Sequence, residues 1–398
     1  MNVVLHDDAV ARGFEPFSLT RPISTLVSGT LPIFARWERM GLTPTGFLAA
    51  EHLADFDEGL EASHELPSGT IVANSRFAPA LDASMDDADG VWTSAGRVVA
   101  VRLTRGLRAA DLRAGSIPLE LIAAPDARMR EIQGWWHDEV WDFLRLLPTV
   151  LAADIVTMGN RKDATPIRSS EHVRVLGSHP VIECGATIDP FVVLDASGGP
   201  ILIEAGATIH SFTRINGPCY IGPNAIIMGG DISGCSFGPV SKIRGEISGS
   251  IVLGYSNKGH EGFVGNSYLG RWVNLGAGTT TSNLKNTYGQ VALWTPTGIR
   301  PTGMQFLGTM FGDHVKTGIG TTLTTGTVLG AGANVFGSQM PPKAVAPFSW
   351  GEGEPYDLYA IDKFLVTAET VMGRRKLQMS EGMKRQLTAS FEKRWSAK

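Results

Sequence analysis

Aliphatic residues recur at every sixth position through much of the region between Gly177 and Gly337. A period of six fits neither the turn of an α-helix nor the alternation of a half-buried strand. It is the hexapeptide signature of a parallel β-helix, in which each short strand directs one aliphatic side chain into a prismatic core. We therefore predict this fold here. The registers are Ile203, Ile209, Ile215, Ile221 and Ile227; Phe263, Leu269 and Leu275; and Leu323, Leu329 and Val335.

Small residues support the same interpretation. The 47 glycines of the chain concentrate in this region, and mostly small side chains such as Ala207, Cys219 and Ala225 follow the aliphatic residues four positions later. Small residues fit near the corners of a prism, and glycine or asparagine takes turn conformations that disfavour a Cβ. A disordered glycine-rich segment would not keep aliphatic residues at a fixed period.

Two stretches interrupt the register. One runs from about Gly229 to Gly254, and the other from Trp294 to Gln305. Insertions in a repeat array form loops on one face, which often binds ligand. We therefore expect both stretches to be loops.

Residues 1–145 have a different pattern. Strand-like runs such as "MNVVLHDD", "GTIVAN" and "GRVVAVRL" alternate with helix-like stretches, which indicates an α/β domain. We predict a helical connector over 146–176, the β-helix over 177–345 and a helical tail over 346–398. The tail is expected to pack on its own subunit or a neighbouring one.

The composition excludes several classes of protein. The net charge is −4 without a long basic block, which argues against a nucleic-acid partner. The cysteines Cys184, Cys219 and Cys235 form no CxxC pair, so we expect neither a zinc site nor a disulfide framework. No apolar run is long enough to span a bilayer, and we expect no signal peptide in the first residues. We expect a soluble cytoplasmic protein without a membrane partner.

The stretch from Lys258 to Asn283 carries a specific resemblance. It resembles the acetyltransferase site of the bacterial bifunctional enzymes that make UDP-N-acetylglucosamine, which join a uridylyltransferase to a glucosamine-1-phosphate acetyltransferase. The spacing is kept without a gap. The matching residues are Lys258, Gly259, His260, Phe263, Gly265, Asn266, Gly270, Val273, Asn274, Leu275, Gly276, Ala277, Gly278, Thr279 and Asn283.

A divergent, sugar-nucleotidyltransferase-like branch of this family is similar over nearly the whole chain, through "LTRPIS", "GYSNKGHEGFVGNS" and "NLKN". The resemblance implies a nucleotidyltransferase-like α/β domain followed by a left-handed parallel β-helix. It also implies acetyl-CoA as acyl donor and a homotrimer with sites between subunits. The partners implied are a sugar phosphate, a nucleotide and acyl-CoA.

His260 matches the catalytic histidine of the family. Acetylation of an amino sugar needs a base, and the pKa of histidine lies near working pH. The resemblance therefore implies that His260 is the general base. The alternatives are a histidine on a coil surface without a catalytic role, and His314 as the base.

Three residues match sugar-contacting positions of the family: Glu246, Asn274 and Asn283. For the asparagines, a structural role in tight left-handed turns is the alternative.

The resemblance implies that Arg214 holds the phosphate, and Arg244 and Lys258 are further candidates for that role. Arginine suits it because guanidinium groups bind phosphate bidentately. For the two arginines, the alternative is that they are solvated charges at the edge of a coil. The resemblance places coenzyme A along the coil at Ala277, with Lys316 near its phosphates.

Departures from the family pattern leave the sugar and acyl group open. Phe263, Ser248 and Leu284 replace a tyrosine, a lysine and a tyrosine of the family.

The N-terminal loop "HDDAVARGFEPFSLTRPIS" lacks the glycine cradle that closes on phosphates in nucleotidyltransferases. Asp7 and Asp8 are candidate ligands for Mg²⁺ if the domain is active, and Arg12 and Arg21 are candidates for binding a triphosphate. The alternative is that all four are ordinary charges at the end of a strand and the start of a helix.

Together these features predict a transferase of sugar-nucleotide biosynthesis. It would combine acetyl-CoA-dependent N-acetylation of an amino sugar phosphate with nucleotidyl transfer from UTP or dTTP to a sugar 1-phosphate. The alternatives are a nucleotidyltransferase with a structural β-helix, and a non-catalytic scaffold that binds sugar nucleotides.

Overall fold

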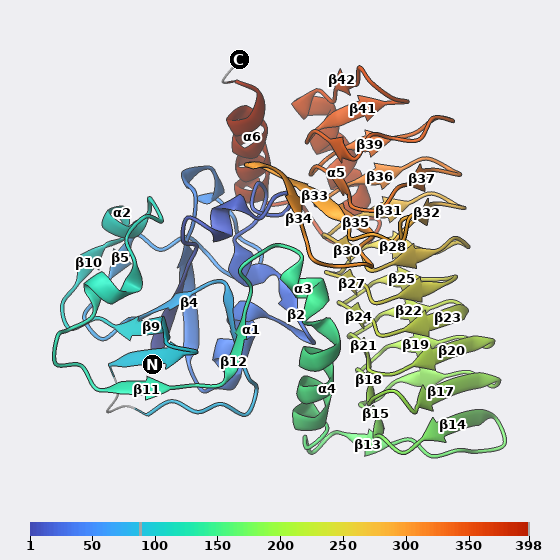
Figure 1. Cartoon of the computed structure of the whole chain (residues 1–398), viewed down its shortest axis with the longest axis horizontal. Helices are drawn as coiled ribbons and strands as arrows, with labels where there is room; N and C mark the ends of the chain where they lie inside the picture. Colours follow the sequence, from blue (N-terminus) through green and yellow to red (C-terminus); the bar gives the residue numbers. More distant parts are fainter. Residues whose placement is uncertain (87–89, 397–398) are drawn as a thin grey trace. The chain divides into compact units, whose positions relative to one another are not determined.

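A computed structural model describes residues 1–86 and 90–396 (Figure 1). The chain forms two compact units. The first contains residues 1–140 and 378–398, and the second contains residues 141–377. The predicted helical tail is therefore divided, because helix α5 (Ile361–Gly373) belongs to the second unit and helix α6 (Glu381–Trp395) to the first.

The first unit is built on a six-stranded mixed sheet, which confirms the predicted α/β domain. Strand β1 pairs in parallel with β4 on one side and with β6 on the other. The sheet order is β11 (Met129–Glu131), β8 (Val91–Ser94), β9 (Arg97–Arg102), β6 (Ile71–Asn74), β1 (Asn2–His6) and β4 (Thr43–Leu48).

Strand order reverses at β1. The chain leaves β1, passes through helix α1 (Ile33–Arg39) to β4 on one side, and later forms β6 on the other side. In open α/β sheets, ligands bind beyond the carboxyl ends of the strands at such a switch point. The residues that follow His6 therefore lie where a ligand site is expected.

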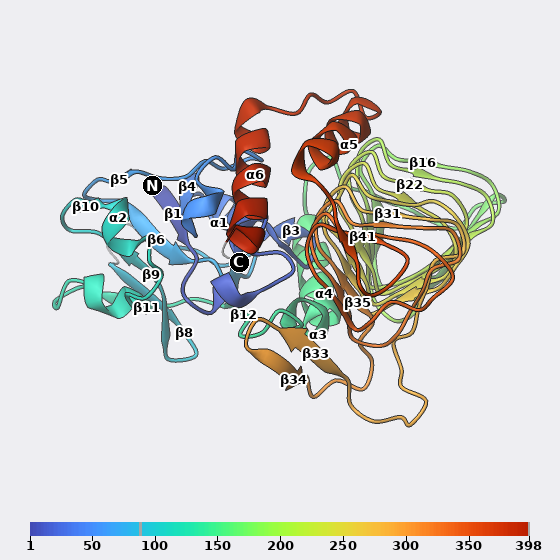
Figure 2. The same cartoon turned by 90° about the horizontal axis from the view of Figure 1, so that it is seen from above.

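The second unit is a parallel β-helix, as predicted, and Figure 2 shows its coils stacked and seen nearly end-on. Three sheets form its sides. Their strands pair in parallel with the equivalent strand of the next coil, except for the antiparallel first strand of one sheet and last strand of another. One sheet runs from β13 (Thr165–Pro166) to β40 (Ala344–Val345). The second runs from β14 (Val173–Gly177) to β29 (Val264–Gly265), and the third from β16 (Thr187–Ile188) to β42 (Asp357–Leu358).

The stretch from Gly229 to Gly254, expected to be a loop, belongs to the coils. It contains the following strands: β23 (Gly230–Ser233), β24 (Ser236–Phe237), β25 (Lys242–Ile243), β26 (Ile247–Ser248) and β27 (Ile251–Val252). The coils contain fewer residues here. The sequence separation between register partners along one sheet shows this, because it decreases within the series Ile203, Ile221, Phe237 and Val252 before Leu269. Shorter corners break the period of six without breaking the fold.

A similar adjustment occurs after His260. Val264, and not the expected Phe263, occupies the core position of strand β29. The core residue Leu269 follows Val264 after five positions and not six, so the register shifts by one residue. Phe263 instead lies against the backbone of Gly265, where a Cβ would come within 2.4 Å of its ring.

The ends of the β-helix also differ from the prediction. The expected connector over 146–176 contains helix α4 (Leu147–Met158), preceded by α3 (Asp142–Arg145), but it already includes the first strands β13 and β14. At the other end, β41 (Ser349–Gly351) and β42 continue the third sheet beyond residue 345. The second predicted loop forms an antiparallel hairpin of β33 (Ala292–Thr295) and β34 (Gly298–Pro301).

No helix within residues 1–86 and 90–396 combines the length and the apolar character needed to cross a membrane.

Two adjacent isoleucines of strand β22 (Ile226–Ile227) provide a test of the core. Ile227 is fully buried in the prism, whereas Ile226 is only partly buried on its outer side. We expect Ile227→Ala to lower the free energy of unfolding of the second unit by about 2–5 kcal/mol, because it leaves a cavity. Ile226→Ala should cost clearly less in the same urea titration. Equal losses would contradict the inward orientation of Ile227.

Candidate functional sites

Two cavities flank the residues that follow β1. Asp8 lines one and Asp7 lines the other. Successive side chains of an extended chain point to opposite faces, so the two adjacent carboxylates do not converge. No cluster of three potential metal-ligating side chains occurs in the described part of the chain. Asp7 and Asp8 therefore do not fit a shared Mg²⁺ site.

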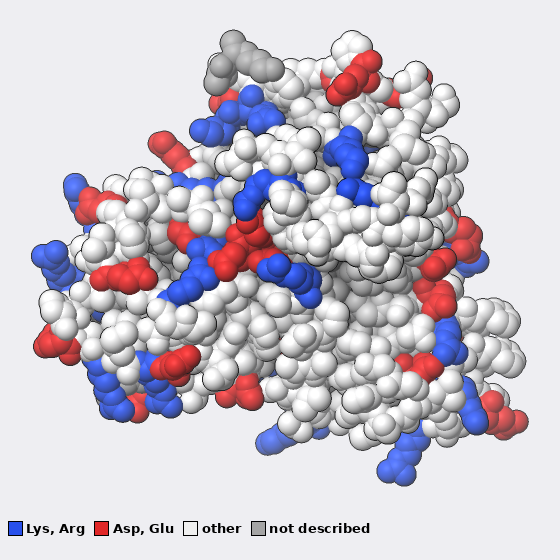
Figure 3. Space-filling model, in the orientation of Figure 1, with Lys and Arg blue, Asp and Glu red and all other residues white. Residues whose placement is uncertain are grey.

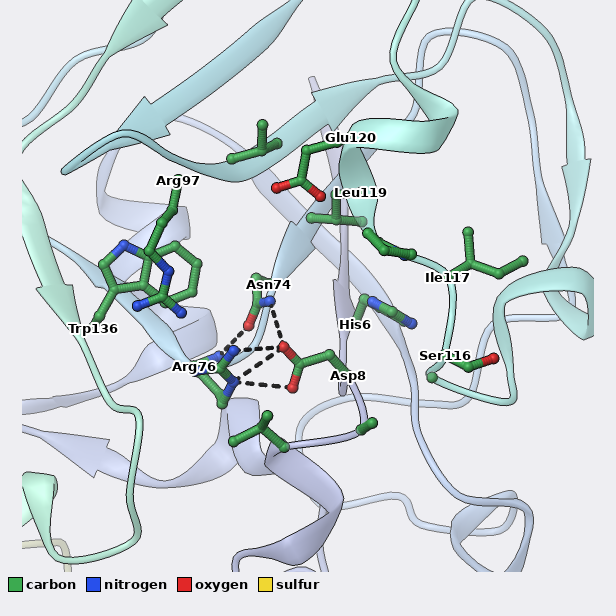
Figure 4. Close-up of a pocket in the computed structure, with 15 residues that line it drawn as sticks. His6, Asp8, Asn74, Arg76, Arg97, Ser116, Ile117, Leu119, Glu120 and Trp136 are labelled. Atoms are coloured by element: carbon green, nitrogen blue, oxygen red, sulfur yellow. Dashed lines mark hydrogen bonds and ion pairs between the residues drawn. The ribbon is translucent and has the colours of Figure 1, made fainter.

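The Asp8 cavity, about 240 Å³ in volume, centres on an ion pair with Arg76 (Figure 4). Arg76 donates from Nη2 to Asp8 Oδ2 at 2.7 Å and from Nε to Oδ1 at 2.9 Å. Asn74 Nδ2 also donates to Asp8 Oδ2 at 2.9 Å. Burial raises the pKa of Asp8, but the hydrogen bonds and charge of Arg76 outweigh it and hold that pKa below its ordinary value.

The far wall of this cavity is also polar. Arg97 stacks on Trp136, with the guanidinium carbon 3.7 Å from the ring centroid, and pairs with Asp138 at 2.9 Å. Figure 4 shows Arg97, Trp136 and Glu120 around the same space. Fixed donors and acceptors of both signs suit a ligand rich in hydroxyl groups.

Asp7 differs sharply from Asp8. It is 2% exposed, and its Oδ2 accepts a hydrogen bond from the backbone N–H of Ile23 at 3.2 Å. Burial raises its pKa from 3.8 to about 7. A carboxyl group with a strongly shifted pKa beside a cavity is a feature of functional sites.

The Asp7 cavity, about 300 Å³ in volume, is also lined by Arg12. Arg12 donates from Nε to the carbonyl of Asp7 at 3.0 Å and from Nη2 to the carbonyl of Arg113. Its hydrogen-bond acceptors are therefore neutral. Other lining residues come from the loop after β1, from the segment after β4 and from α6.

Arg21 does not reach either cavity. It is 2% exposed and pairs with Glu58 at 3.3 Å, and its guanidinium lies 5.7 Å from the ring centroid of Phe56. Burial and this ion pair leave it unsuited to the predicted role of holding a triphosphate.

In the second unit, one edge of the prism collects three of the predicted residues. Arg244, His260 and Ala277 lie on successive coils between the third and second sheets. Backbone hydrogen bonds link these corners: Arg244 N to Lys258 O at 2.7 Å and Gly278 N to Glu261 O at 3.1 Å. Neighbouring coils lie about 4.8 Å apart, so one ligand can span the edge.

His260 is exposed on this edge. The corner requires glycine at position 262, where φ is 130° and a Cβ would lie 2.2 Å from the carbonyl oxygen of Thr279. Arg244 Nε donates to Glu261 Oε1 at 2.8 Å, so this arginine remains on the edge. Glu246 is exposed on the same coil as Arg244.

Lys258 does not face solvent as its predicted role requires. It follows Ile243 in the inward register and is 3% exposed. Its Nζ donates to the carbonyls of Arg244 at 2.8 Å and His260 at 2.5 Å. Burial lowers its pKa from 10.5 to about 8, against the charge of Glu261. Lys258 therefore holds the backbone that carries His260 and does not contact a ligand on the surface.

Two predicted residues lie away from this edge. Arg214 lies three coils earlier and pairs with Asp195. Asn283 lies at the next corner of the prism and donates to Asn266 at 2.7 Å. Neither is brought to His260.

Asn274 and Lys316 lie on the third sheet as register partners. Asn274 accepts a hydrogen bond from Asn257 at 2.9 Å, in a ladder of outward-facing side chains. Lys316 Nζ donates to the carbonyl of His314 at 3.2 Å, and burial lowers the pKa of Lys316 to about 8. Its amino group is therefore directed toward the start of its strand.

His314, the alternative base, is 4% exposed and packed between aromatic rings. Its ring lies 6.4 Å from that of Trp272 and 5.5 Å from that of Phe364 of α5. It is therefore not accessible to a substrate.

The sequence did not reveal several residues of the first unit's cavities. Arg76 binds Asp8 across 68 positions, and α6 supplies Lys393 and Arg394 to the Asp7 cavity. The clustered basic residues at the end of the chain were the only available signal for the last two.

Comparisons with known proteins confirm the predicted resemblance. Residues 3–162 match the family model described as sugar nucleotidyl transferase. A bifunctional sugar-1-phosphate nucleotidylyltransferase/acetyltransferase of Sulfurisphaera tokodaii is 32% identical over 168 residues, which cover 39% of this chain and 39% of the relative.

Two proteins named bifunctional protein GlmU are also similar. That of Methanococcus vannielii is 33% identical over 112 residues, covering 28% of this chain and 25% of the relative. That of Rippkaea orientalis is 26% identical over 185 residues, covering 36% and 40%. The matches thus span about two fifths or less of these relatives, all of which are named as transferases or bifunctional proteins.

The opposite environments of the two aspartates predict opposite effects on stability. The raised pKa of Asp7 contributes stability that is present below pH 3.8 and is lost as the pH rises through about 7. Asp7→Asn, which carries no charge, should therefore raise the urea midpoint at pH 8 and have little effect at pH 4.

Asp8→Asn is the matched comparison. Because the pKa of Asp8 is lowered, its contribution is present above the ordinary pKa, and this substitution should lower the midpoint at pH 8. Loss of stability at pH 8 in Asp7→Asn would contradict the environment assigned to Asp7.

Proposed function

We propose that this chain is a transferase of sugar-nucleotide biosynthesis with two separate sites. The first unit transfers a nucleotidyl group from UTP or dTTP to a sugar 1-phosphate. The β-helix transfers the acetyl group of acetyl-CoA to the nitrogen of an amino sugar phosphate resembling glucosamine 1-phosphate. The observation that carries the proposal is the sugar nucleotidyl transferase match over residues 3–162, which includes the loop after β1 that lines both cavities.

In the nucleotidyl reaction, a phosphate oxygen of the sugar 1-phosphate attacks the α-phosphorus of the nucleoside triphosphate, and pyrophosphate leaves. The balanced donors and acceptors around Asp8 and Arg76 suit the sugar hydroxyls. The unpaired charge of Arg12 suits the phosphates on the other side of β1. Positioning and charge stabilisation are the main contributions a protein makes to such a reaction.

In the acetyl reaction, the sugar nitrogen attacks the thioester carbonyl, the C–S bond breaks and coenzyme A leaves as its thiol. His260 takes the proton that the nitrogen loses. The exposure of His260, its attachment to a backbone held by Lys258, and its position beside Ala277 support this role. Arg244 and Glu246 are exposed on the coil before that of His260 and are the candidates for binding the phosphate and the sugar hydroxyls. Asn274 remains a candidate for binding the sugar, because its side chain faces outward in the ladder with Asn257.

A nucleotidyltransferase with a purely structural β-helix is the second candidate. It is favoured by one observation: Lys258, Arg214 and Asn283, which the resemblance assigns to the substrate, are engaged within the β-helix itself.

Assay of His260→Ala distinguishes the two candidates. Positioned general-base catalysis contributes about 10²–10⁴-fold to rate, so thiol release from acetyl-CoA with glucosamine 1-phosphate should fall by about that factor. Pyrophosphate release and the melting temperature should stay unchanged. His210→Ala is the matched control, since His210 is exposed on the same edge three coils earlier and pairs with Asp189.

Near-wild-type thiol release in His260→Ala would overturn the role of His260. Absence of thiol release in the wild type, with pyrophosphate release intact, would favour the nucleotidyltransferase alone. Absence of both activities with common sugar phosphates would favour a non-catalytic scaffold that binds sugar nucleotides.

We also propose that the chain forms a homotrimer through its β-helix, in keeping with the resemblance. Outward positions of the coils carry polar pairs such as Asn216 with Asp231 and Asn257 with Asn274, which do not favour an apolar contact. The support comes instead from Phe191 and Phe212, whose stacked rings are 68% and 79% exposed. Exposed aromatic pairs of this kind often mark contact surfaces.

Sedimentation equilibrium at micromolar concentration should give three times the monomer mass of 42.6 kDa. Replacing Phe191 and Phe212 together by Ser should shift the protein toward monomers. A monomeric wild type would contradict the proposal.

A further inference from the structure

Helix α6 is fixed to the first unit at its start. Ser380 caps the helix by accepting a hydrogen bond from Met383 N at 2.9 Å, and its hydroxyl donates to Asp57 Oδ2 at 2.5 Å. Arg385 donates to Asp55 at 2.7 Å. These contacts join the last helix of the chain to the segment that follows β4.

The second half of α6 is fixed to the loop that follows β1. Ser390 Oγ donates to the carbonyl of Leu19 at 2.8 Å, and Gln386 Nε2 donates to Ser390 Oγ at 2.9 Å. Both side chains are buried. His52, of the short helix η3 (Glu51–Leu53), also approaches the carbonyl of Leu19, with its Nε2 at 3.1 Å. One carbonyl therefore joins α6, η3 and the β1 loop.

This attachment directs two cations toward the Asp7 cavity. Residues three and four apart share a helix face, so Lys393 and Arg394 follow the buried Ser390. Both line the cavity, as Arg12 does. Within the described residues, neither Lys393 nor Arg394 forms an ion pair or a side-chain hydrogen bond. Figure 3 shows basic side chains gathered at this end of α6.

The charges of the cavity do not cancel. Burial raises the pKa values of both acidic residues that line it, Asp7 and Glu15, which favours their neutral forms. The pKa of His52 is lowered by burial and also by the charges of Lys393 and Arg12. Three cations thus line one space beside two acidic residues whose charged forms burial disfavours, an arrangement that attracts an anion of several charges.

We propose that helix α6 completes a polyphosphate-binding site in the first unit, with Arg12, Lys393 and Arg394 holding the phosphate chain of a nucleotide. Arginine binds phosphate oxygens in a bidentate manner and lysine supplies a point charge. The identification of the ligand as a nucleotide rests on the proposed function, whereas the binding of a polyphosphate rests on the cavity itself. The end of the chain is then part of a ligand site of the N-terminal domain.

Calorimetric titration of the full chain with inorganic pyrophosphate tests the site directly. Each lost charge-assisted contact should weaken binding about tenfold or more. Lys393→Gln and Arg394→Gln should each do so, and the double variant should weaken binding further. Lys384→Gln, on the same helix but paired with Glu381 outside the cavity, is the control and should leave binding unchanged.

Further arms exclude a structural explanation. The melting temperature reports whether α6 stays docked, and Arg394→Lys should recover part of the affinity. Arg12→Gln, in the loop after β1, should weaken pyrophosphate binding as well. Unchanged pyrophosphate affinity in the double variant would overturn the proposal.

Titrations with UTP and with glucosamine 1-phosphate test whether the site binds a polyphosphate or a sugar phosphate. UTP should follow pyrophosphate in losing affinity, while glucosamine 1-phosphate should change less. The reverse order would overturn the assignment to a polyphosphate. If pyrophosphate binds as expected but the wild type releases none from UTP, the site stands and the proposed nucleotidyl reaction fails.

Discussion

The pairing of β1 on both of its sides is the constraint on which the first unit depends. Parallel neighbours hold the strand in register and reverse the strand order at its carboxyl end. The alternation of side chains then separates Asp7 from Asp8. One becomes an ion-paired carboxylate with a lowered pKa and the other a buried carboxyl with a raised pKa. Two adjacent residues of one type thus create two chemically different cavities.

Coil stacking plays the equivalent role in the β-helix. It brings Arg244, His260 and Ala277 onto one edge although long stretches of sequence separate them. The same inward register that carries Ile243 also carries Lys258. A lysine is tolerated there because its apolar stem lies in the core while its amino group reaches two carbonyls of the corner. The residue beside the candidate base therefore has a structural role in fixing that base.

The features of the fold that depend on local periodicity were predicted from the sequence. The six-residue repeat identified the β-helix, and the alternating pattern identified the α/β domain. Prediction failed where corners change length: the shortened coils between Gly229 and Gly254 resembled a loop, and Phe263 was placed in the core instead of Val264. Motif matching singled out His260, which the structure places on an exposed edge, but could not show which way Lys258 points.

Contacts between distant positions were beyond any local signal. Ser390 binds the carbonyl of Leu19 across 371 positions, so nothing near Arg12 indicated that α6 supplies two further cations to its cavity. The long separation of Asp8 from Arg76 likewise hid their ion pair. The N-terminal loop lacks the glycine cradle. In the proposed site, Arg12 and the cations of α6 hold the phosphates in its place.

The central claim is that ligands of the first unit bind in the cavities on both sides of the end of β1. Hydrogen–deuterium exchange of the wild-type chain, with and without UTP, tests it without requiring turnover. The account predicts that UTP slows exchange in peptides that contain Asp7 to Arg12, Asn74 to Arg76 and the second half of α6. Protection confined to the coils from Arg244 to Gly320, or absent from all these peptides at saturating UTP, would contradict it.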